Sequence, residues 1–287
     1  MKTRQCISPS TRPPQIWHQT NMRHSLQQMF LFGMAFAVSL ALTSHADTVT
    51  VPSGSILTIQ DGINAAAPGD TVAVRPGIYA GGAVVSTPDL TLSVAGPPGS
   101  VKIIGAGPVS PWVSIGLRVS ANGVTIQGFD VSGVVVGIWV DGLKGVQITG
   151  NHLHDNSLEG IVVTSGASLV RVDHNSVENN GYSGILVEDC RDVRVDHNSA
   201  KGSQIGILLA FPLGVDVDHN TVTGNVDGLD LWVGATGGCG NTLDHNTAQG
   251  NTNRDLASGD DPAASCNSYK DNYAEIAYPS LSLWDVK

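Results

Sequence analysis

The chain has 287 residues, with 15 Lys and Arg against 25 Asp and Glu, which gives a formal net charge of −10 at neutral pH. Such an acidic chain is a poor nucleic-acid binder, because phosphate contacts need a basic surface. It also repels a polyanion unless a cation such as Ca²⁺ bridges the two.

The first 46 residues are predicted to be a secretory signal peptide with an upstream extension. Residues 29–42 form an apolar run that is too short to cross a membrane comfortably; Arg23 precedes the run and the small residue Ala46 follows it. Cleavage is expected after Ala46, and either the first residue or Met22 is the true start. The mature chain, residues 47–287, is therefore predicted to be one domain that is secreted or periplasmic and not inserted in the membrane.

The mature chain opens with a predicted capping helix. In the stretch TIQDGINAAA, Thr58 and Asp61 have the spacing of a capping box, in which each side chain satisfies a backbone N–H at the start of a helix. Pro68 and Gly69 are expected to end this helix. Because exposed sheet edges invite pairing with other chains, we expect the helix to cover the N-terminal end of the structure that follows.

A repeat of 22 to 26 residues occupies the centre and the end of the chain. The heptapeptide VRVDHNS occurs at residues 170–176 and again at residues 193–199, and its Asn recurs at Asn151, Asn175, Asn198, Asn220, Asn246 and Asn272. A second alternating segment that begins with Gly lies between successive Asn residues, as in GIWV, GIVV and GILV. Short alternating β-segments without helical periodicity, repeated at this length, indicate one coil of a solenoid per repeat.

The repeat favours an all-β parallel β-helix of about ten coils over other repeat folds. A leucine-rich repeat needs a framework of Leu residues that this chain lacks, and a β-propeller blade needs about 40 residues. Val and Ile are expected to point inward. The Asn of each coil is expected to sit in a tight turn with positive φ and to hydrogen-bond to the Asn of the next coil.

Two stretches carry a resemblance to a known family. TIQDGINAAAPGDTVAVRPGIYAGGAVV looks like the opening of pectin-lyase-like parallel β-helix proteins, and the V-x-V-D-H-N-x-V and G-I-L-V segments resemble the right-handed β-helix repeat. That repeat is found in polysaccharide lyases, epimerases and hydrolases, and in NosD-like periplasmic proteins. The resemblance implies the fold strongly and the activity weakly, because one fold hosts many functions.

The end of the chain is similar to the closing coils of bacterial members of this group, in which a Cys pair clips the last coil. The resemblance implies a disulfide between Cys239 and Cys266, which are 27 residues apart, about one coil. Cys190 is then expected to be buried and free, in an oxidising compartment.

The strand that begins with Gly has an unusual outward face, because tryptophans and carboxylates flank an apolar stripe. Two outward columns are expected: Trp139, Val162, Leu186, Leu208 and Asp230, and then Asp141, Thr164, Glu188, Ala210 and Trp232. Aromatic platforms beside carboxylates suit sugar rings. Tyr182, Glu159 and Asp227 are expected at the edge of such a groove. The alternative is that loops cover this face and the tryptophans pack beneath them.

Glu188 and Asp230 are the candidate catalytic pair. They lie two coils apart, about 9–10 Å by strand spacing, near the upper end for an inverting acid–base pair. With Asp141 they form an alternative Ca²⁺ site that would neutralise a uronate. The face is expected to offer no outward Lys or Arg as the base of a lyase. The Gly-His-Gly and Arg-Ile-Lys of polygalacturonase-type hydrolases and the Asp-Pro-His-Asp of alginate epimerases are absent.

A column of four histidines is expected beside the Asn turns: His174, His197, His219 and His245. Histidines in register are a candidate transition-metal site, and NosD-like relatives are labelled copper-binding. The structural alternative is that each His packs beside its turn, because every coil solves the same steric problem. His152, His154 and Asp155 occupy an earlier coil in a shifted order, which weakens a continuous metal column.

The sequence therefore favours a secreted β-helix protein that binds or acts on a polysaccharide. The candidate substrate-binding residues are Trp139, Asp141, Tyr182, Glu188, Asp230 and Trp232. One alternative is a non-catalytic envelope scaffold, because the short turns leave little loop with which to build pocket walls. A lesser alternative is a periplasmic copper carrier.

Overall fold

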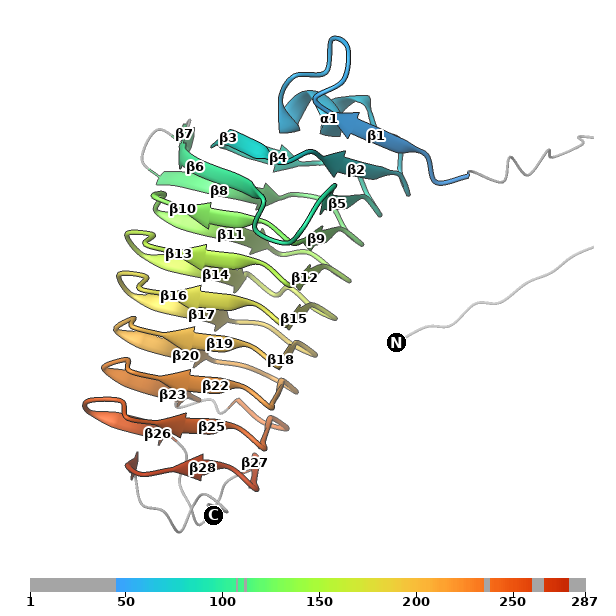
Figure 1. Ribbon diagram of the computed structural model, residues 1–287. Helices are drawn as coiled ribbons and strands as arrows, with labels where there is room; N and C mark the ends of the chain where they lie inside the picture. The colour runs from blue at the N-terminus through green and yellow to red at the C-terminus, as the bar shows by residue number, and fades with distance from the viewer. Residues whose placement is uncertain (1–44, 107, 111–112, 235–237, 260–265, 279–287) are drawn as a thin grey trace, which may run out of the picture. The chain divides into compact units, whose positions relative to one another are not determined.

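The computed structural model describes residues 45–106, 108–110, 113–234, 238–259 and 266–278. These residues form a parallel β-solenoid of about nine turns with one short helix, α1 (Ile59–Ala65), at its N-terminal end (Figure 1). The predicted all-β solenoid is thus confirmed, with a turn count close to the expected ten. Almost the whole predicted signal peptide lies outside the described residues. Within them, no helix is both long and apolar enough to cross a membrane.

Three sheets run along the solenoid, and each turn contributes one strand to each sheet. The first sheet contains, in order, β1 (Thr48–Val51), β2 (Thr71–Val74), β5 (Thr91–Val94), β9 (Thr125–Gln127), β12 (Gln147–Thr149), β15 (Arg171–Asp173), β18 (Arg194–Asp196), β21 (Asp216–Asp218), β24 (Thr242–Asp244) and β27 (Ser268–Lys270).

The second sheet contains β3 (Gly77–Gly81), β6 (Val101–Ala106), β10 (Asp130–Ser132), β13 (His152–His154), β16 (Ser176–Glu178), β19 (Ser199–Lys201), β22 (Thr221–Thr223), β25 (Thr247–Gln249) and β28 (Tyr273–Ala274). The third sheet contains β4 (Ala83–Val85), β8 (Val113–Val119), β11 (Val136–Asp141), β14 (Glu159–Thr164), β17 (Ser183–Glu188), β20 (Ile205–Ala210), β23 (Asp227–Trp232), β26 (Arg254–Ser258) and β29 (Ala277–Tyr278). Strand β7 (Pro108–Ser110) pairs antiparallel with β8.

The core is a single apolar column enclosed by the three sheets. Identical positions of successive turns pair in register, so that Ile148, Val172 and Val195 lie above one another on the first sheet, each fully buried. β-Branched residues pack well on such a pleated surface, which explains why most of the core residues are Val and Ile, with Leu next.

Buried Asn residues bind the turns between the first and second sheets to one another. The Asn175 side-chain amide donates to the carbonyl of Ile148 at 2.9 Å and to the side chain of Asn198 at 3.0 Å. The Asn-to-Asn bonds predicted from the repeat are therefore present. The positive φ expected at the Asn lies instead at the residue before it, as at His174 (56°). The Asn side chain itself points inward, where it satisfies buried backbone groups.

The N-terminal helix is capped as the sequence predicts. Asp61 N–H donates to the Thr58 hydroxyl at 3.0 Å, and the Asp61 carboxylate accepts from Thr58 N–H at 2.9 Å. The helix ends at Ala65, before Pro68. Gly62 is buried where a Cβ would collide with Val51 of β1, so glycine allows the helix to lie directly on the end of the solenoid.

At the C-terminal end, Cys239 and Cys266 form the predicted disulfide, with their Cα atoms 5.2 Å apart. Cys190 is free and buried, also as predicted. The disulfide joins two successive turns beside β24 and β27.

Candidate functional site

The outward columns of the third sheet lie where the repeat places them. Trp139 pairs in register with Val162, and Leu186, Leu208 and Asp230 follow on the next strands. The second column contains Asp141, Thr164, Glu188, Ala210 and Trp232. Because strands are about 4.8 Å apart, Trp139 and Trp232 are separated by about 19 Å along the solenoid.

A surface pocket with a volume of about 240 Å³ lies on this face, over strands β8, β11, β14 and β17. Val162 and Leu186 form its apolar floor, and Trp139, Glu159 and Glu188 line it with an indole and two carboxylates. Its floor belongs to a small apolar cluster outside the main core, which also includes the buried residues Ile115 and Val136. The pocket thus combines apolar contact area with a few hydrogen-bonding groups.

Trp139 is held in place from two sides. Its indole N–H donates to the Thr164 hydroxyl at 3.2 Å, and the Arg118 guanidinium lies 5.6 Å from its ring centroid, within cation–π range. Arg118 also reaches Asp141, at 4.0 Å. One side of the indole is thus engaged by Arg118, and Asp141 is engaged by the same cation.

Arg118 corrects the expectation that this face lacks an outward cation. It pairs in register with Trp139, so its side chain occupies the Trp139 column. The segment that begins at Gly116 reads Gly-Leu-Arg-Val, which has the same pattern as the Gly-Ile-Trp-Val of the next turn. Extending the repeat one turn toward the N-terminus would have found it.

The pocket environment changes the acidity of Glu159. Burial, together with the negative charge of Glu188, raises the pKa of Glu159 above its ordinary value. A carboxyl group that holds its proton to higher pH beside a second carboxylate is a common arrangement for acid–base chemistry on a substrate. Glu159, expected only at the edge of a groove, therefore lies inside the pocket.

Asp230 is placed differently from what its candidate catalytic role requires. Its side chain is only 1% exposed, and Arg254, from the next strand, lies 3.3 Å away. Burial raises the pKa of Asp230, and the charge of Arg254 offsets only part of this effect. Asp230 does not line the pocket that contains Glu188, so the two residues do not form one acid–base site.

Arg254 is a second cation on the third sheet. It makes two hydrogen bonds with Asp227, at 2.9 and 2.8 Å, and these bonds lower the pKa of Asp227. Arg254 pairs in register with Asp227, at the position just before Gly228, but its own segment has Asp255 where the other turns have Gly. Because the sequence pattern was defined by strands that begin with Gly, it did not include this strand.

On β20, C-terminal to the pocket, the outward side chains are buried. Leu208 and Ala210 point outward in the register but are 2% and 3% exposed. Trp232 is 44% exposed on the next strand. Tyr182 is half-buried, and its backbone N–H donates to the carbonyl of the pocket-lining Leu158 at 2.8 Å. Among the described residues, the face therefore has a pocket at Trp139 and buried outward residues at Leu208 and Ala210.

The expected Ca²⁺ ligands do not converge. Asp141 faces Arg118, Asp230 faces Arg254, and Glu188 lines the pocket. Among the described residues, these three carboxylates form no group whose oxygens lie close enough together to share an ion. They lie on β11, β17 and β23, so neighbouring members of the set are two strands apart, about 10 Å by strand spacing.

The four column histidines stack as rings, at 5.0 Å between successive centroids and with interplanar angles of 2–4°. Each Nδ1 faces the Asp before it; for His197 and Asp196 the distance is 3.1 Å. Parallel rings at this spacing do not aim their nitrogens at one point. Within the described chain, His174, His197 and His219 belong to no group of three potential ligands, whereas His245 lies in one with Asp244 and Asp271.

Residues 109–262 match the family model described as the right-handed β-helix region. The chain belongs to this family. The match covers the turns that carry the pocket, the His column and all of the Asn ladders except their last members, Asn267 and Asn272. No curated protein matches this β-helix protein.

Solved structures with the same fold include several enzymes of polysaccharide metabolism. An alginate lyase from Paenibacillus sp. str. FPU-7 is 18% identical, with a TM-score of 0.55 over 84% of this chain and 97% of its own. The pectate lyase Pel9A is 16% identical, with a TM-score of 0.60 over 83% of this chain and 79% of its own. The periplasmic alginate epimerase AlgG is 15% identical, with a TM-score of 0.55 over 78% of this chain and 53% of its own. At such low identity these likenesses show the shared fold.

Proposed function

We propose that this β-helix protein binds a polysaccharide in the pocket of Trp139, Glu159 and Glu188. The observation that carries the proposal is the composition of the pocket, an apolar floor of Val162 and Leu186 with an indole and two carboxylates around it. The C–H face of a sugar ring is suited to the apolar surface, and its hydroxyls are suited to carboxylate acceptors. The similar folds that act on alginate and pectate support a glycan over another ligand.

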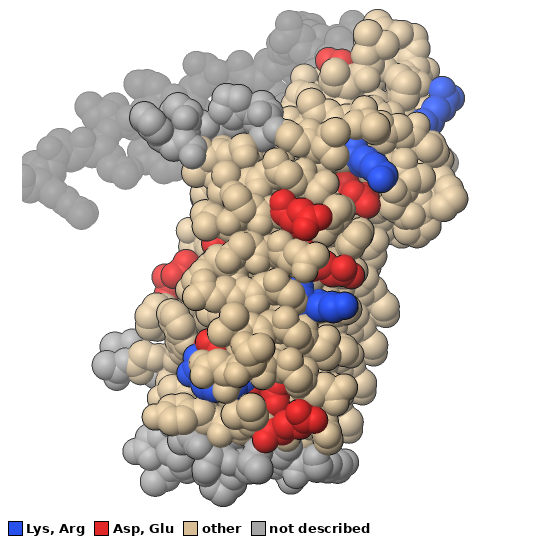
Figure 2. Space-filling view, turned by 60° about the vertical axis from the view of Figure 1, so that its left-hand side comes forward, with Lys and Arg blue, Asp and Glu red and all other residues tan. Residues whose placement is uncertain are grey.

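The charges favour a neutral glycan over a polyuronate. The pocket holds two carboxylates, and its nearest cation, Arg118, is already engaged with Trp139 and Asp141. On the face drawn in Figure 2, Lys and Arg side chains are few, and Asp and Glu side chains and uncharged surface separate them. A polyanion would therefore meet net repulsion at this pocket.

Direct titration with soluble glycans tests the proposal. Neutral polysaccharides and polyuronates, each with and without Ca²⁺, are titrated into the full chain and into the Trp139→Ala variant. We expect a neutral glycan to bind, and Trp139→Ala to weaken its binding about tenfold, or about 1.4 kcal/mol. Trp232→Ala is the matched control, because it removes an exposed indole of the same sheet outside the pocket. Equal loss in both variants, or no glycan bound by the wild type, contradicts the proposal.

Glu159 is the residue that we propose as proton donor if the bound glycan is cleaved. Burial and the negative charge of Glu188 raise the pKa of Glu159, which favours the protonated form that a proton donor needs. Glu159→Gln should then abolish release of reducing ends while glycan affinity stays within about threefold of wild type. Loss of affinity with unchanged turnover would instead assign Glu159 to binding alone.

A protein partner is the second candidate occupant of this face. The apolar cluster around Val162 and Leu186 includes the partly buried Val113 and Val135, which also line the pocket. Exposed apolar surface of this kind also suits a second protein chain. Light scattering during size exclusion tests self-association, which Leu186→Glu should abolish if the face is an interface between copies.

We further propose that the chain is exported to the periplasm or beyond, as the N-terminal segment predicts. The Cys239–Cys266 disulfide supports this location, because stable disulfides form in oxidising compartments. N-terminal sequencing of the protein from a native host should show Asp47 as the first residue.

A further inference from the structure

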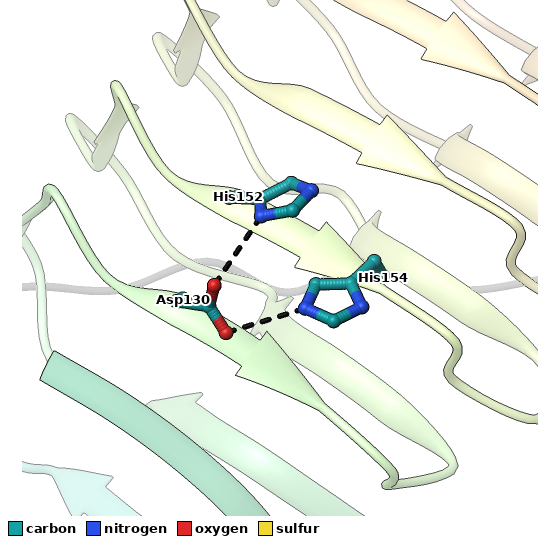
Figure 3. A group of neighbouring side chains, drawn as sticks. All are labelled: Asp130, His152 and His154. Atoms are coloured by element: carbon teal, nitrogen blue, oxygen red, sulfur yellow. Dashed lines mark hydrogen bonds and ion pairs between the residues drawn. The ribbon is translucent and has the colours of Figure 1, made fainter. Parts of the chain in front are cut away.

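A cluster of His and Asp lies on the second sheet, away from the pocket. Asp130 of β10 and His152 of β13 pair in register on adjacent strands, and His154 lies two residues further along β13 on the same face. Figure 3 shows the three side chains pointing toward one another. One ligand atom from each lies within 4.8 Å of the other two.

The separations in this cluster suit a shared ion better than direct hydrogen bonds. Asp130 Oδ2 lies 3.3 Å from His152 Nδ1, and Asp130 Oδ1 lies 3.3 Å from His154 Nε2. Hydrogen bonds between an imidazolium and a carboxylate are usually about 2.7–2.9 Å long. Metal–ligand bonds of about 2.0–2.2 Å in a tetrahedral site place neighbouring ligand atoms about 3.3–3.6 Å apart.

Asp155 holds His154 in the orientation of a ligand. Its carboxylate lies 2.6 Å from His154 Nδ1, on the opposite edge of the ring from the Asp130 contact. When Nδ1 donates its proton to Asp155, the lone pair of Nε2 points at the cluster. A carboxylate on the far nitrogen of a metal-binding His is the usual outer partner in protein metal sites.

The charges around the cluster favour a cation. Besides Asp130 and Asp155, the Glu178 carboxylate lies 4.0 Å from His152 Nε2. Three carboxylates thus surround two imidazoles, and the exposed Lys102, which pairs in register with Asp130 on β6, offsets one of the three negative charges. The Asp130 side chain is 14% exposed and that of His154 24%, so the group is partly withdrawn from solvent but still reachable.

The stacked column of His174, His197, His219 and His245 differs from this cluster in how its imidazoles are placed. His197 also has a carboxylate on Nδ1, that of Asp196 at 3.1 Å, yet its Nε2 shares no group of three potential ligands within the described residues. The shifted order of His152 and His154 places two imidazoles on one strand face, two residues apart. These two rings also stack, with centroids 4.4 Å apart and planes 23° from parallel, but each of them has a nitrogen 3.3 Å from the same carboxylate, that of Asp130.

We propose that Asp130, His152 and His154 bind one divalent transition-metal ion. Imidazole with carboxylate is a ligand set that suits Zn²⁺ and its neighbours in the first transition row. Three protein ligands leave at least one position of a four-coordinate ion to water or another ligand. The site is separate from the proposed glycan pocket on the third sheet and does not depend on it.

Equilibrium dialysis of the full, metal-stripped chain against Zn²⁺ tests the proposal. We expect an uptake that His154→Ala and Asp130→Asn each weaken at least tenfold, and that Asp155→Asn weakens about tenfold through the ring of His154. His197→Ala is the matched control and should leave affinity unchanged. Thermal melts of every variant establish that each is folded, and Zn²⁺ should raise the melting temperature of the wild type but not of His154→Ala.

Three outcomes would overturn the proposal. The first is no Zn²⁺ uptake by the wild type. The second is uptake that His154→Ala leaves at full affinity. The third is uptake that disappears in His245→Ala, which would assign the ion to the group of Asp244, His245 and Asp271 instead.

Discussion

At the scale of single residues, the environment of each carboxylate decides its role more than its column does. Glu159, Glu188 and Asp230 all belong to strands of the third sheet, but only the two glutamates line the pocket. Asp230 is enclosed and paired with Arg254, which came from a strand whose Gly is replaced. Residues that interrupt the repeat therefore have two different roles. Glu159 and Glu188 line the pocket, whereas Asp230 and Arg254 form an ion pair outside it.

Cys190 is expected to be chemically inert in the folded protein. Burial raises the pKa of its thiol to about 11, so roughly one thiol in a thousand is ionised at pH 8. Iodoacetamide at pH 8, followed by mass mapping of the Cys190 peptide, should show no label before unfolding and full label in guanidinium. Rapid labelling of the native chain would mean that this turn opens readily.

Asp196 is expected to make stability depend on acid. Burial alone would raise its pKa, but hydrogen bonds from Arg171 and His197 outweigh burial and lower the pKa. A carboxyl whose pKa is lower in the folded than in the unfolded state stabilises the fold at pH values above its unfolded pKa of about 3.9. This stabilisation is lost as the pH falls through the folded pKa. Asp196→Asn should therefore be less stable than wild type at pH 7, and the difference should shrink below about pH 4.

Urea unfolding at pH 7 and pH 3 measures this difference. Asp216→Asn is the control, because Asp216 is exposed in the outward column that pairs with Arg194. A gap between Asp196→Asn and wild type that stays constant across this pH range would show that the ionised form of Asp196 does not stabilise the fold.

At the scale of elements, the Asn ladder links each turn to the next. Asn198 donates to the Val172 carbonyl at 2.8 Å, and its side-chain oxygen accepts from Asn175 N–H at 2.9 Å. Asn198→Ala leaves these buried partners unsatisfied, each at a cost of about 1–3 kcal/mol. We expect the free energy of unfolding to fall by about 3 kcal/mol in urea titration.

Asn64→Ala is the control for the ladder variant. Asn64 is exposed on α1 and accepts one hydrogen bond from Gln60, so its loss should change stability by no more than about 0.5 kcal/mol. Equal effects of the two substitutions would show that water replaces the ladder bonds without cost.

At the scale of the whole molecule, stability is the sum of turn-to-turn contacts, because every strand pairs with the strands of adjacent turns. The Cys239–Cys266 disulfide closes a loop with a sequence separation of 27 residues at the last turns. A loop of this size stabilises by about 3–4 kcal/mol in the chain-entropy description. Reduction of the disulfide should lower the melting temperature of the wild type. The melting temperature of the double variant Cys239→Ser/Cys266→Ser should be the same with and without reductant. An unchanged wild-type melt, with both thiols shown to be free, would contradict this prediction.

The sequence by itself determined the solenoid, its length to within about one turn, its capping helix, the disulfide and the two outward columns of the third sheet. The solenoid and its columns follow from the period of the repeat, which local geometry converts directly into position. The helix follows from its capping box, and the disulfide from the resemblance to the closing coils of the family. Only the tertiary structure decided which outward residues are accessible. Arg118 and Arg254 come from other turns, so their contacts with Asp141 and Asp230 depend on side-chain reach across strands. The convergence of Asp130, His152 and His154 has the same origin, because a repeat predicts which residues share a face but not which atoms meet.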